Sequence, residues 1–260
     1  GKYMSFTGNM SGSLICEYLL SQKKAMGELP EDGYVVESIV STDMMKAVAA
    51  EYGCELREVL TGFKWIGREI LESERRGRGH YMFGMEESYG CLTGTYARDK
   101  DAIAAVAMLC EAAAFCKKQG KTLWDVMQDM YRHYGYYRES IDTVELAGIE
   151  GAEKISAIME GFRAARPERL SDLKVLRIRD YQNDTVTELS DGSVRPTGLP
   201  VSNVMYFELE NNSWVCARPS GTEPKLKIYT GVKGSSGENA AELADKLHAD
   251  IRRRFIDTDR

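Results

Sequence analysis

Strand-like and helix-like segments alternate through the first part of this 260-residue chain. The run from Tyr34 to Val40 is rich in β-branched residues and follows turn residues at 30–33, which is typical of a strand. A helical repeat begins after Thr42 or Asp43 and ends at Gly53. The alternation continues with strands expected at 56–60 and 80–83 and with helices expected at 63–75, 99–118 and 122–134.

Strands that alternate with helices are joined by crossover connections, so this part predicts an α/β domain. Its sheet should be mostly parallel, with helices on both faces. Ligands of such sheets lie beyond the carboxyl ends of the strands, where the loops after Leu60 and Phe83 are expected. In the helix at 99–118, the apolar residues follow the spacing of one stripe, made of Ile103, Val106, Ala107, Cys110, Ala113 and Ala114.

Past about residue 136 the pattern changes to consecutive strands joined by short turns. Two helices flank these strands, which predicts a smaller α+β domain with an antiparallel sheet. We therefore divide the chain into domains at 1–135 and 136–260. The expected strands are 141–146, 175–181, 204–210, 214–217 and 225–232, and the expected helices are 150–165 and 238–255.

The balance of charged residues limits the partners of this chain. Lys and Arg number 34 against 40 Asp and Glu, which gives a formal net charge of −6 and a pI near 5.3. These values argue against broad attraction to nucleic acid or to an anionic membrane surface. No run of about 18 apolar residues is present, and the first residues do not resemble a signal peptide. We expect a cytoplasmic protein without a nucleic-acid or membrane partner.

The cysteines are scattered among apolar neighbours and form no C-x-x-C pair. Only His80, His133 and His248 could join them as soft ligands, so we expect no metal site. We interpret the thiols as reduced residues of the core. They are Cys16, Cys54, Cys91, Cys110, Cys116 and Cys216.

The segment 218–227 combines groups that bind phosphate, and it lies between two expected strands. Arg218 offers a planar fork of donors that matches phosphate oxygens. Ser220 and Thr222 add hydroxyl donors, and Gly221 lets the backbone approach an anion closely. The alternative is an ordinary hairpin in which serine and glycine serve the geometry of the turn.

A second polar segment runs from Gly84 to Gly90. Glu86 and Ser88 pair a carboxylate with a hydroxyl, which can accept from one sugar hydroxyl and donate to the next. On an extended loop Glu87 would point the other way, toward solvent. The alternative is the first turn of a helix, where glutamate offsets the helix dipole.

Two lysines stand beside these segments. Lys64 follows Thr61 and Gly62 at one expected strand end, and Lys100 lies between two aspartates. Either could be an ordinary surface lysine.

Taken together and in this order, the segments resemble the phosphoglucomutase/phosphomannomutase family of α-D-phosphohexomutases. The resemblance rests on Thr61-Gly-Phe-Lys64, on Phe83-Gly-Met-Glu-Glu-Ser-Tyr-Gly90, on Arg98-Asp-Lys-Asp101 and on Arg218-Pro-Ser-Gly-Thr-Glu-Pro-Lys225. Residues 8–12 also look like the start of that family's third domain, preceded by a short remnant of the second. The chain therefore resembles domains 3 and 4 of a four-domain enzyme.

The resemblance implies roles for individual residues. Glu86 and Ser88 would hold sugar hydroxyls, with Thr61, Gly62 and Lys64 lining the same substrate site. Lys100 matches a family position beside the reacting phosphoryl group and would assist proton transfer. The phosphate that does not react would be held by Arg218, Ser220, Gly221 and Thr222.

Two motifs of the family are absent from this sequence. The phosphoserine motif of the Thr-Ala-Ser-His-Asn-Pro kind and the Mg²⁺ loop of the Asp-Gly-Asp-x-Asp-Arg kind do not occur. Asp99 and Asp101 alone do not make a cage for a hard cation. We expect this chain to bind no cofactor and to be inactive alone, because phosphoryl transfer depends on positioning and on charge stabilisation.

The resemblance implies that the intact enzyme interconverts hexose 1-phosphate and hexose 6-phosphate. It would use Mg²⁺, a hexose 1,6-bisphosphate intermediate and the missing N-terminal domains. Two alternatives remain open: a non-catalytic regulatory module that binds phosphosugars, and part of a synthase that makes a sugar bisphosphate.

Overall fold

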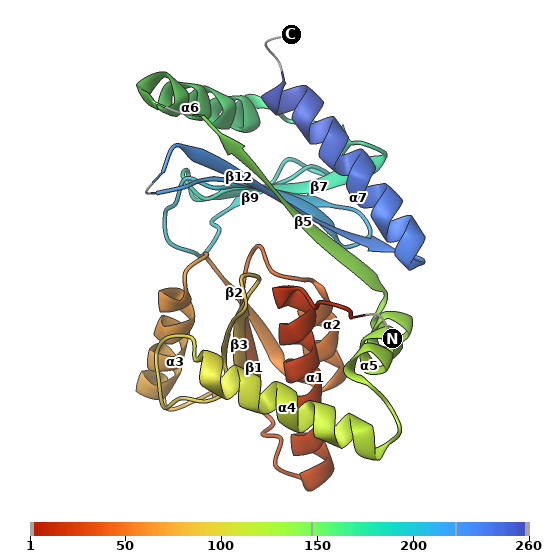
Figure 1. The fold of residues 1–260 in the computed structure, drawn as a ribbon. Coiled ribbons are helices and arrows are strands. Elements are labelled where there is room, and N and C mark those ends of the chain that lie inside the picture. The colour runs from red at the N-terminus through yellow and green to blue at the C-terminus, as the bar shows by residue number, and fades with distance from the viewer. Residues whose placement is uncertain (1–2, 147, 222, 258–260) are drawn as a thin grey trace. The chain divides into compact units, whose positions relative to one another are not determined.

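The computed structural model describes residues 3–146, 148–221 and 223–257. The chain forms two compact units that divide between Gly135 and Tyr136. Unit 1 is a mixed α/β unit, and unit 2 contains a larger antiparallel sheet (Figure 1). None of the helices within the described ranges has the length and apolar character needed to cross a membrane.

The sheet of unit 1 has the strand order β2-β1-β3-β4. Strands β1 (Gly33–Ser38), β2 (Glu55–Val59) and β3 (His80–Glu86) are parallel, and β4 (Gly90–Leu92) returns antiparallel to β3. Strand β1 is buried along its whole length, as expected for a central strand with helices on both faces. The prediction of a mostly parallel sheet is confirmed.

Helices cover both faces of this sheet. Helix α3 (Phe63–Arg76) places Ile66 and Ile70 against Tyr34 and Tyr81 on one face. Helix α1 (Gly8–Met26) contacts β3 from the other face, where the absence of a side chain at Gly12 leaves room for Met85. Helix α2 (Met44–Glu51) packs beside α1 against β1 and β2.

One carboxylate on α1 connects this helix to two neighbouring helices. Glu17 of α1 accepts hydrogen bonds from Tyr52 after α2 at 2.6 Å and from Tyr134 at the end of α5 (Leu123–Tyr134) at 2.8 Å. These two phenols fix α2 and α5 relative to α1. The capping box of Thr122 and Asp125 fixes the beginning of α5.

Helix α4 (Ala102–Lys118) departs from the usual amphipathic arrangement. Its residues Ala105, Ala112 and Cys116 are buried, so this side of the helix packs against the rest of unit 1. The apolar stripe noted in the sequence lies mostly on the opposite side, with Ile103 84% and Val106 60% exposed. The interpretation of all six cysteines as core residues was therefore wrong for Cys110, which is exposed on this helix.

Unit 2 contains an antiparallel sheet with the order β5-β12-β11-β10-β7-β8-β9, and β6 pairs with β7. Its strands are β5 (Tyr136–Glu145), β6 (Arg169–Leu170), β7 (Leu173–Asp180), β8 (Thr185–Glu188), β9 (Val194–Arg195), β10 (Met205–Leu209), β11 (Ser213–Pro219) and β12 (Lys225–Gly234). Strand β5 pairs with β12 from Glu145 to Tyr136 without a break. The predicted antiparallel sheet is confirmed.

One face of this sheet is covered by α6 (Gly148–Ala164) and α7 (Gly237–Ile251), the latter followed by the π-helical turn at Arg252–Ile256. Phe162 stacks on Phe255 and also lies beside Phe207 of β10 in the core. On the other face, Trp214 stacks on Tyr206 with ring centroids 5.5 Å apart. Alternate residues of the central strands thus serve two different apolar clusters.

The segment from Gly84 to Gly90 is a β-hairpin, rather than a loop or a helix start. Glu86 is the last residue of β3 and pairs with Gly90 across a three-residue turn. Tyr89 closes the turn with φ +66, the left-handed conformation common at this position of such turns. The expectation that Glu86 lies on an extended loop was wrong.

Candidate functional site

The carboxyl ends of three parallel strands bring polar residues together in unit 1. β1 ends at Ser38, β2 at Val59 before the Thr61–Gly62 turn, and β3 at Glu86. This is the edge where ligands of parallel sheets bind.

Glu86 lies at the centre of this edge. Its residue is 5% exposed, and its Oε1 accepts a hydrogen bond from the backbone N–H of Gly62 at 2.7 Å. The N–H belongs to the residue before α3, so the carboxylate lies at the positive end of that helix. The partial positive charge at the start of this helix therefore offsets the cost of burying the Glu86 carboxylate.

Lys100 supplies the second contact of this carboxylate. Its Nζ lies 3.6 Å from Oε2 of Glu86 and 5.9 Å from the centre of the Phe63 ring. The lysine side chain remains 53% exposed, whereas that of Glu86 is 7% exposed. Lys100 is therefore the solvent-exposed partner of the buried Glu86 carboxylate.

The other predicted residues of this site are placed differently. Ser88 is exposed in the hairpin turn, one residue beyond Glu87. The ammonium of Lys64 lies 5.0 Å from the centre of the Trp65 ring, and no contact of this ammonium with Glu86 occurs among the described interactions. Thr61 is half-buried beside Gly62. Glu86, Gly62 and Lys100 are thus brought together, and Lys64 is not part of that cluster.

Two serines at this edge were missed from the sequence. Ser38 Oγ lies 2.9 Å from Ser41 Oγ and donates to Oε2 of Glu87 at 3.3 Å. Both serines are buried. The signal was available, because polar residues that directly follow a buried parallel strand mark its ligand-binding end.

The second predicted site is the β11–β12 connection in unit 2. The N–H of Ser220 donates to the carbonyl of Lys225 at 2.7 Å, which closes this connection as a tight loop. Gly221 is exposed in it, and Thr222 lies outside the described residues. Lys225 makes ion pairs with Glu145 at 3.0 Å and Glu223 at 3.3 Å, and these carboxylates raise the pKa of Lys225.

Arg218 and Lys227 have a different environment. They are directly opposite one another on neighbouring antiparallel strands, and each side chain is partly exposed. No carboxylate of the described residues lies within ion-pair distance of either cation, whereas Arg177, on strand β7 of the same sheet, pairs with Glu188 and Glu208 at 2.7 Å each. Like charges that face each other across a sheet are destabilising.

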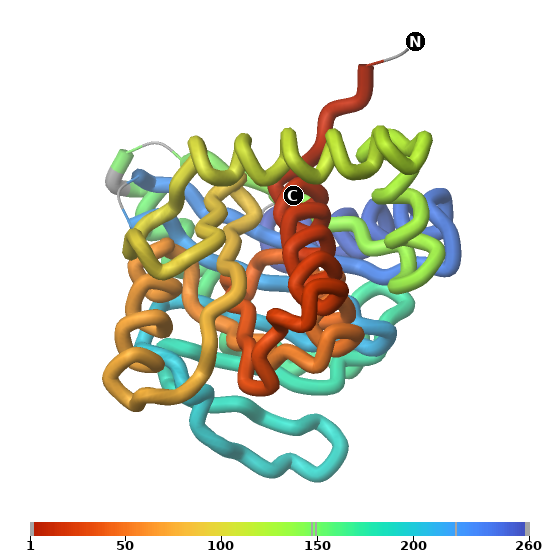
Figure 2. The backbone as a smooth tube through the Cα atoms, turned by 90° about the horizontal axis from the view of Figure 1, so that it is seen from below, coloured from red at the N-terminus to blue at the C-terminus, as the bar shows by residue number. Residues whose placement is uncertain are grey.

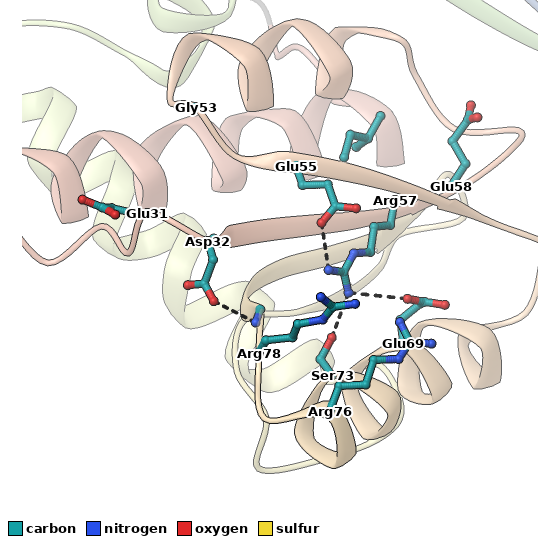
Figure 3. Close-up of a pocket in the computed structure, with 13 residues that line it drawn as sticks. Glu31, Asp32, Gly53, Glu55, Arg57, Glu58, Glu69, Ser73, Arg76 and Arg78 are labelled. Carbon is teal, nitrogen blue, oxygen red and sulfur yellow. Dashed lines mark hydrogen bonds and ion pairs between the residues drawn. The ribbon is translucent and has the colours of Figure 1, made fainter.

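A cavity lies at the opposite edge of the unit 1 sheet. It has a volume of about 640 Å³ and lies at the amino ends of the strands, between Asp32, Glu55 and Arg78 (Figure 3). Arg57 crosses it and donates to Ser73 and Glu55 at 2.8 Å each. This cavity contains neither predicted site.

The described residues do not form a metal centre. No three side chains of His, Cys, Asp or Glu gather there in a way that could hold an ion. They therefore do not fit a Mg²⁺ ion.

Two family profiles match this chain. Residues 7–134 match the phosphoglucomutase/phosphomannomutase α/β/α domain III, and residues 164–249 match the C-terminal domain of the same family. The chain belongs to the phosphoglucomutase/phosphomannomutase family. The resemblance stated from the sequence motifs is confirmed, and the matched domains are the two that the motifs indicated.

Bacterial phosphoglucomutases are similar to this family member along nearly its whole length. A phosphoglucomutase of Staphylococcus aureus strain bovine RF122 / ET3-1 is 35% identical over 251 residues, which are 96% of this chain and 44% of that protein. A phosphoglucomutase of Staphylococcus epidermidis is 35% identical over 236 residues, which are 89% of this chain and 41% of that protein. The chain thus spans less than half the length of these relatives.

Solved structures show the same fold. The open form of the Paramecium phosphoprotein parafusin, a phosphoglucomutase, aligns over 98% of this chain and 43% of its own, with a TM-score of 0.62 and 18% identity. A phosphoglucomutase/phosphomannomutase family protein of Burkholderia thailandensis aligns over 96% of this chain and 42% of its own, with a TM-score of 0.57 and 15% identity.

Proposed function

We propose that this chain is the substrate-binding C-terminal part of a phosphohexomutase. The intact enzyme would interconvert hexose 1-phosphate and hexose 6-phosphate in the cytoplasm, through a bisphosphate intermediate. The observation that carries the proposal is the facing pair of Arg218 and Lys227, which has no acidic partner among the described residues. A bound phosphate dianion would offset their repulsion.

Unit 1 would bind the sugar. Oε2 of Glu86 is 3.6 Å from Lys100, which leaves lone pairs of this oxygen for sugar hydroxyls. Ser88 would donate a further hydrogen bond from the exposed turn. Lys100 would be the residue that moves a proton at the reacting phosphoryl group, since its ammonium is partly exposed to solvent and lies 3.6 Å from the Glu86 carboxylate.

The parts of the reaction that this chain lacks would come from the remainder of a longer protein. The phosphoserine and the Mg²⁺ loop have no counterpart in this sequence, and the chain spans 44% of the Staphylococcus aureus relative. We expect the purified chain to show no mutase activity. Turnover by the chain alone would contradict this assignment of roles.

The phosphate site is tested by measuring the affinity of the chain for glucose 6-phosphate by ³¹P NMR titration. Arg218→Ala should weaken binding by about tenfold or more, because charge-assisted hydrogen bonds contribute roughly 1.5–3 kcal/mol. Arg218→Lys keeps the charge but loses the planar fork, so its affinity should be intermediate. In the full-length enzyme, Arg218→Ala should raise the KM.

Arg166→Ala is the matched control, because it removes the same charge from an exposed position of unit 2. It should leave the affinity unchanged. Equal affinities of the wild type and Arg218→Ala for glucose 6-phosphate would overturn the phosphate site.

A further inference from the structure

Helix α4 carries an apolar surface that no described residue of unit 1 covers. We call it the α4 outer face, and it consists of exposed residues that recur along one side of the helix: Ile103, Val106, Ala107, Cys110 and Ala114. The first two are among the most exposed large apolar side chains of the described chain, at 84% and 60%.

The opposite side of the same helix is apolar as well. Ala105, Ala112 and Cys116 are buried against unit 1, and Phe115 packs on Tyr18 with ring centroids 5.5 Å apart. Within the helix, charged residues are confined to Glu111 and the last turn, at Lys117 and Lys118. A helix that is apolar all round is normally buried, and a contiguous exposed apolar face marks an interaction site.

We propose that the α4 outer face is the docking surface for the part of the mutase polypeptide that lies outside domains III and IV. This inference rests on the proposed function, because it requires that the chain belongs to a longer protein. The face has small residues at Ala107, Cys110 and Ala114 and no charge to be satisfied. It therefore suits close packing against another apolar surface of the same protein.

The length of the relatives favours this occupant. The Staphylococcus aureus protein has more than half of its length outside the region that matches this chain. The N-terminal segment also leaves unit 1 on the side that carries α4 (Figure 2). It is attached there by the Phe6 carbonyl, which accepts from Tyr89 at 3.1 Å, and by the Phe6 ring, 6.1 Å from that of Trp124.

A polypeptide joined to this segment would therefore meet the α4 side first. Tyr3 and Met4 of this segment are exposed, at 105% and 53%. A second copy of the chain is the competing occupant, with Cys110 facing Cys110 across two antiparallel helices.

The test uses Cys110 as a reporter, since it is the exposed cysteine and Cys16, Cys54, Cys91, Cys116 and Cys216 are buried. Burial also raises the pKa of Cys91 to about 12, so the buried thiols react slowly. The alkylation rate of Cys110 with N-ethylmaleimide is measured by mass spectrometry in this chain and in the full-length protein. We expect alkylation to be at least tenfold slower in the full-length protein.

A pair of variants gives a second measurement. Val106→Asp should leave the thermal midpoint of this chain unchanged, because the side chain is exposed, and should lower the midpoint of the full-length protein. Val201→Asp is the control, since Val201 is 71% exposed in an irregular segment of unit 2. It should change neither midpoint.

Each outcome decides the question. Equal alkylation rates overturn the docking surface, and if the full-length protein has mutase activity, the proposed function stands. A concentration-dependent dimer of this chain that forms a Cys110–Cys110 disulfide on oxidation also overturns it, in favour of a second copy. A gene product that contains no further polypeptide would overturn both this inference and the proposed function.

Discussion

Gly62 holds the position of Glu86 through its backbone. Its φ of +115 and ψ of 118 lie in a region that residues with a side chain rarely adopt, and this conformation directs its N–H toward Glu86 Oε1. The side chain that we propose to bind sugar is thus oriented by a residue that has no side chain.

Gly62→Ala should therefore affect binding as well as stability. We expect a loss of about 1–3 kcal/mol of unfolding free energy from backbone strain, and affinity for glucose 6-phosphate about tenfold lower. Gly27→Ala is the control, because Gly27 also has a positive φ, of +71, and a Cβ added there would meet no atom within 4 Å. It should cost about 1–2 kcal/mol and leave binding unchanged. Urea unfolding and NMR titration measure the two effects, and equal binding by both variants would contradict this role of Gly62.

Asp32 gives the stability of unit 1 a dependence on pH. Hydrogen bonds from His80 and from the N–H of Gly79 hold the pKa of Asp32 below its usual value. Because the pKa is lower in the folded state, this contribution is present above about pH 3.9, the value of an unfolded aspartate. It is lost as the pH falls through the lower pKa of the folded state.

Asp32→Asn should lower the urea midpoint at neutral pH, and the difference from wild type should shrink as the pH falls below about 3.9. Glu28→Gln is the control, since Glu28 is exposed and makes no ion pair with the described residues. Its midpoint should follow the wild type at every pH. A constant difference between Asp32→Asn and wild type would exclude this linkage.

For single residues, the sequence indicates which side chains can bind a ligand more readily than it indicates which neighbours they contact. Arg218 was singled out from the sequence because a guanidinium beside hydroxyls and glycine is typical of a phosphate-binding loop, and its role stays a prediction. The pairing of Glu86 with Lys100 could not, because it depends on the three-residue turn that brings β4 back beside β3. That turn requires Tyr89 in a left-handed conformation, which its residue type does not indicate.

Among the elements, β12 depends on the absence of a side chain at one position. Gly231 faces Trp214 across the strand pair, and a Cβ at Gly231 would lie 2.3 Å from the indole nitrogen. Gly231→Ala should therefore destabilise unit 2 by about 1–3 kcal/mol through overpacking. Gly161→Ala, in helix α6 with no atom within 4 Å, should instead stabilise it by about 0.5–1 kcal/mol. Thermal unfolding measures both, and effects of the same sign would contradict the packing argument.

Long elements with a clear period were predicted well, and short ones were not. The helix expected at 63–75 is α3, and the strand expected at 225–232 lies within β12. Strands β4, β6 and β9 were missed because two or three residues carry no period. The stripe on α4 was found, but a stripe alone does not say which of two apolar sides faces the unit.

For the whole molecule, the two units have separate cores. One cluster is built around Tyr34 and Ile66 of unit 1, and the buried residues of the other run from Ile155 to Phe255 of unit 2. Residues 1–135 and 136–260, expressed separately, should each fold and unfold cooperatively. Circular dichroism with urea titration measures this, and a fragment that remains unfolded would show that its core is not sufficient.

The facing cations Arg218 and Lys227 set the stability of unit 2 against the proposed binding of phosphate. Neutralising Lys227 would relieve repulsion in the empty chain and so raise its melting temperature, while removing charge that a phosphate would meet. A screen for heat-resistant variants would enrich such a substitution, and a screen for the phosphate binding that we propose would discard it.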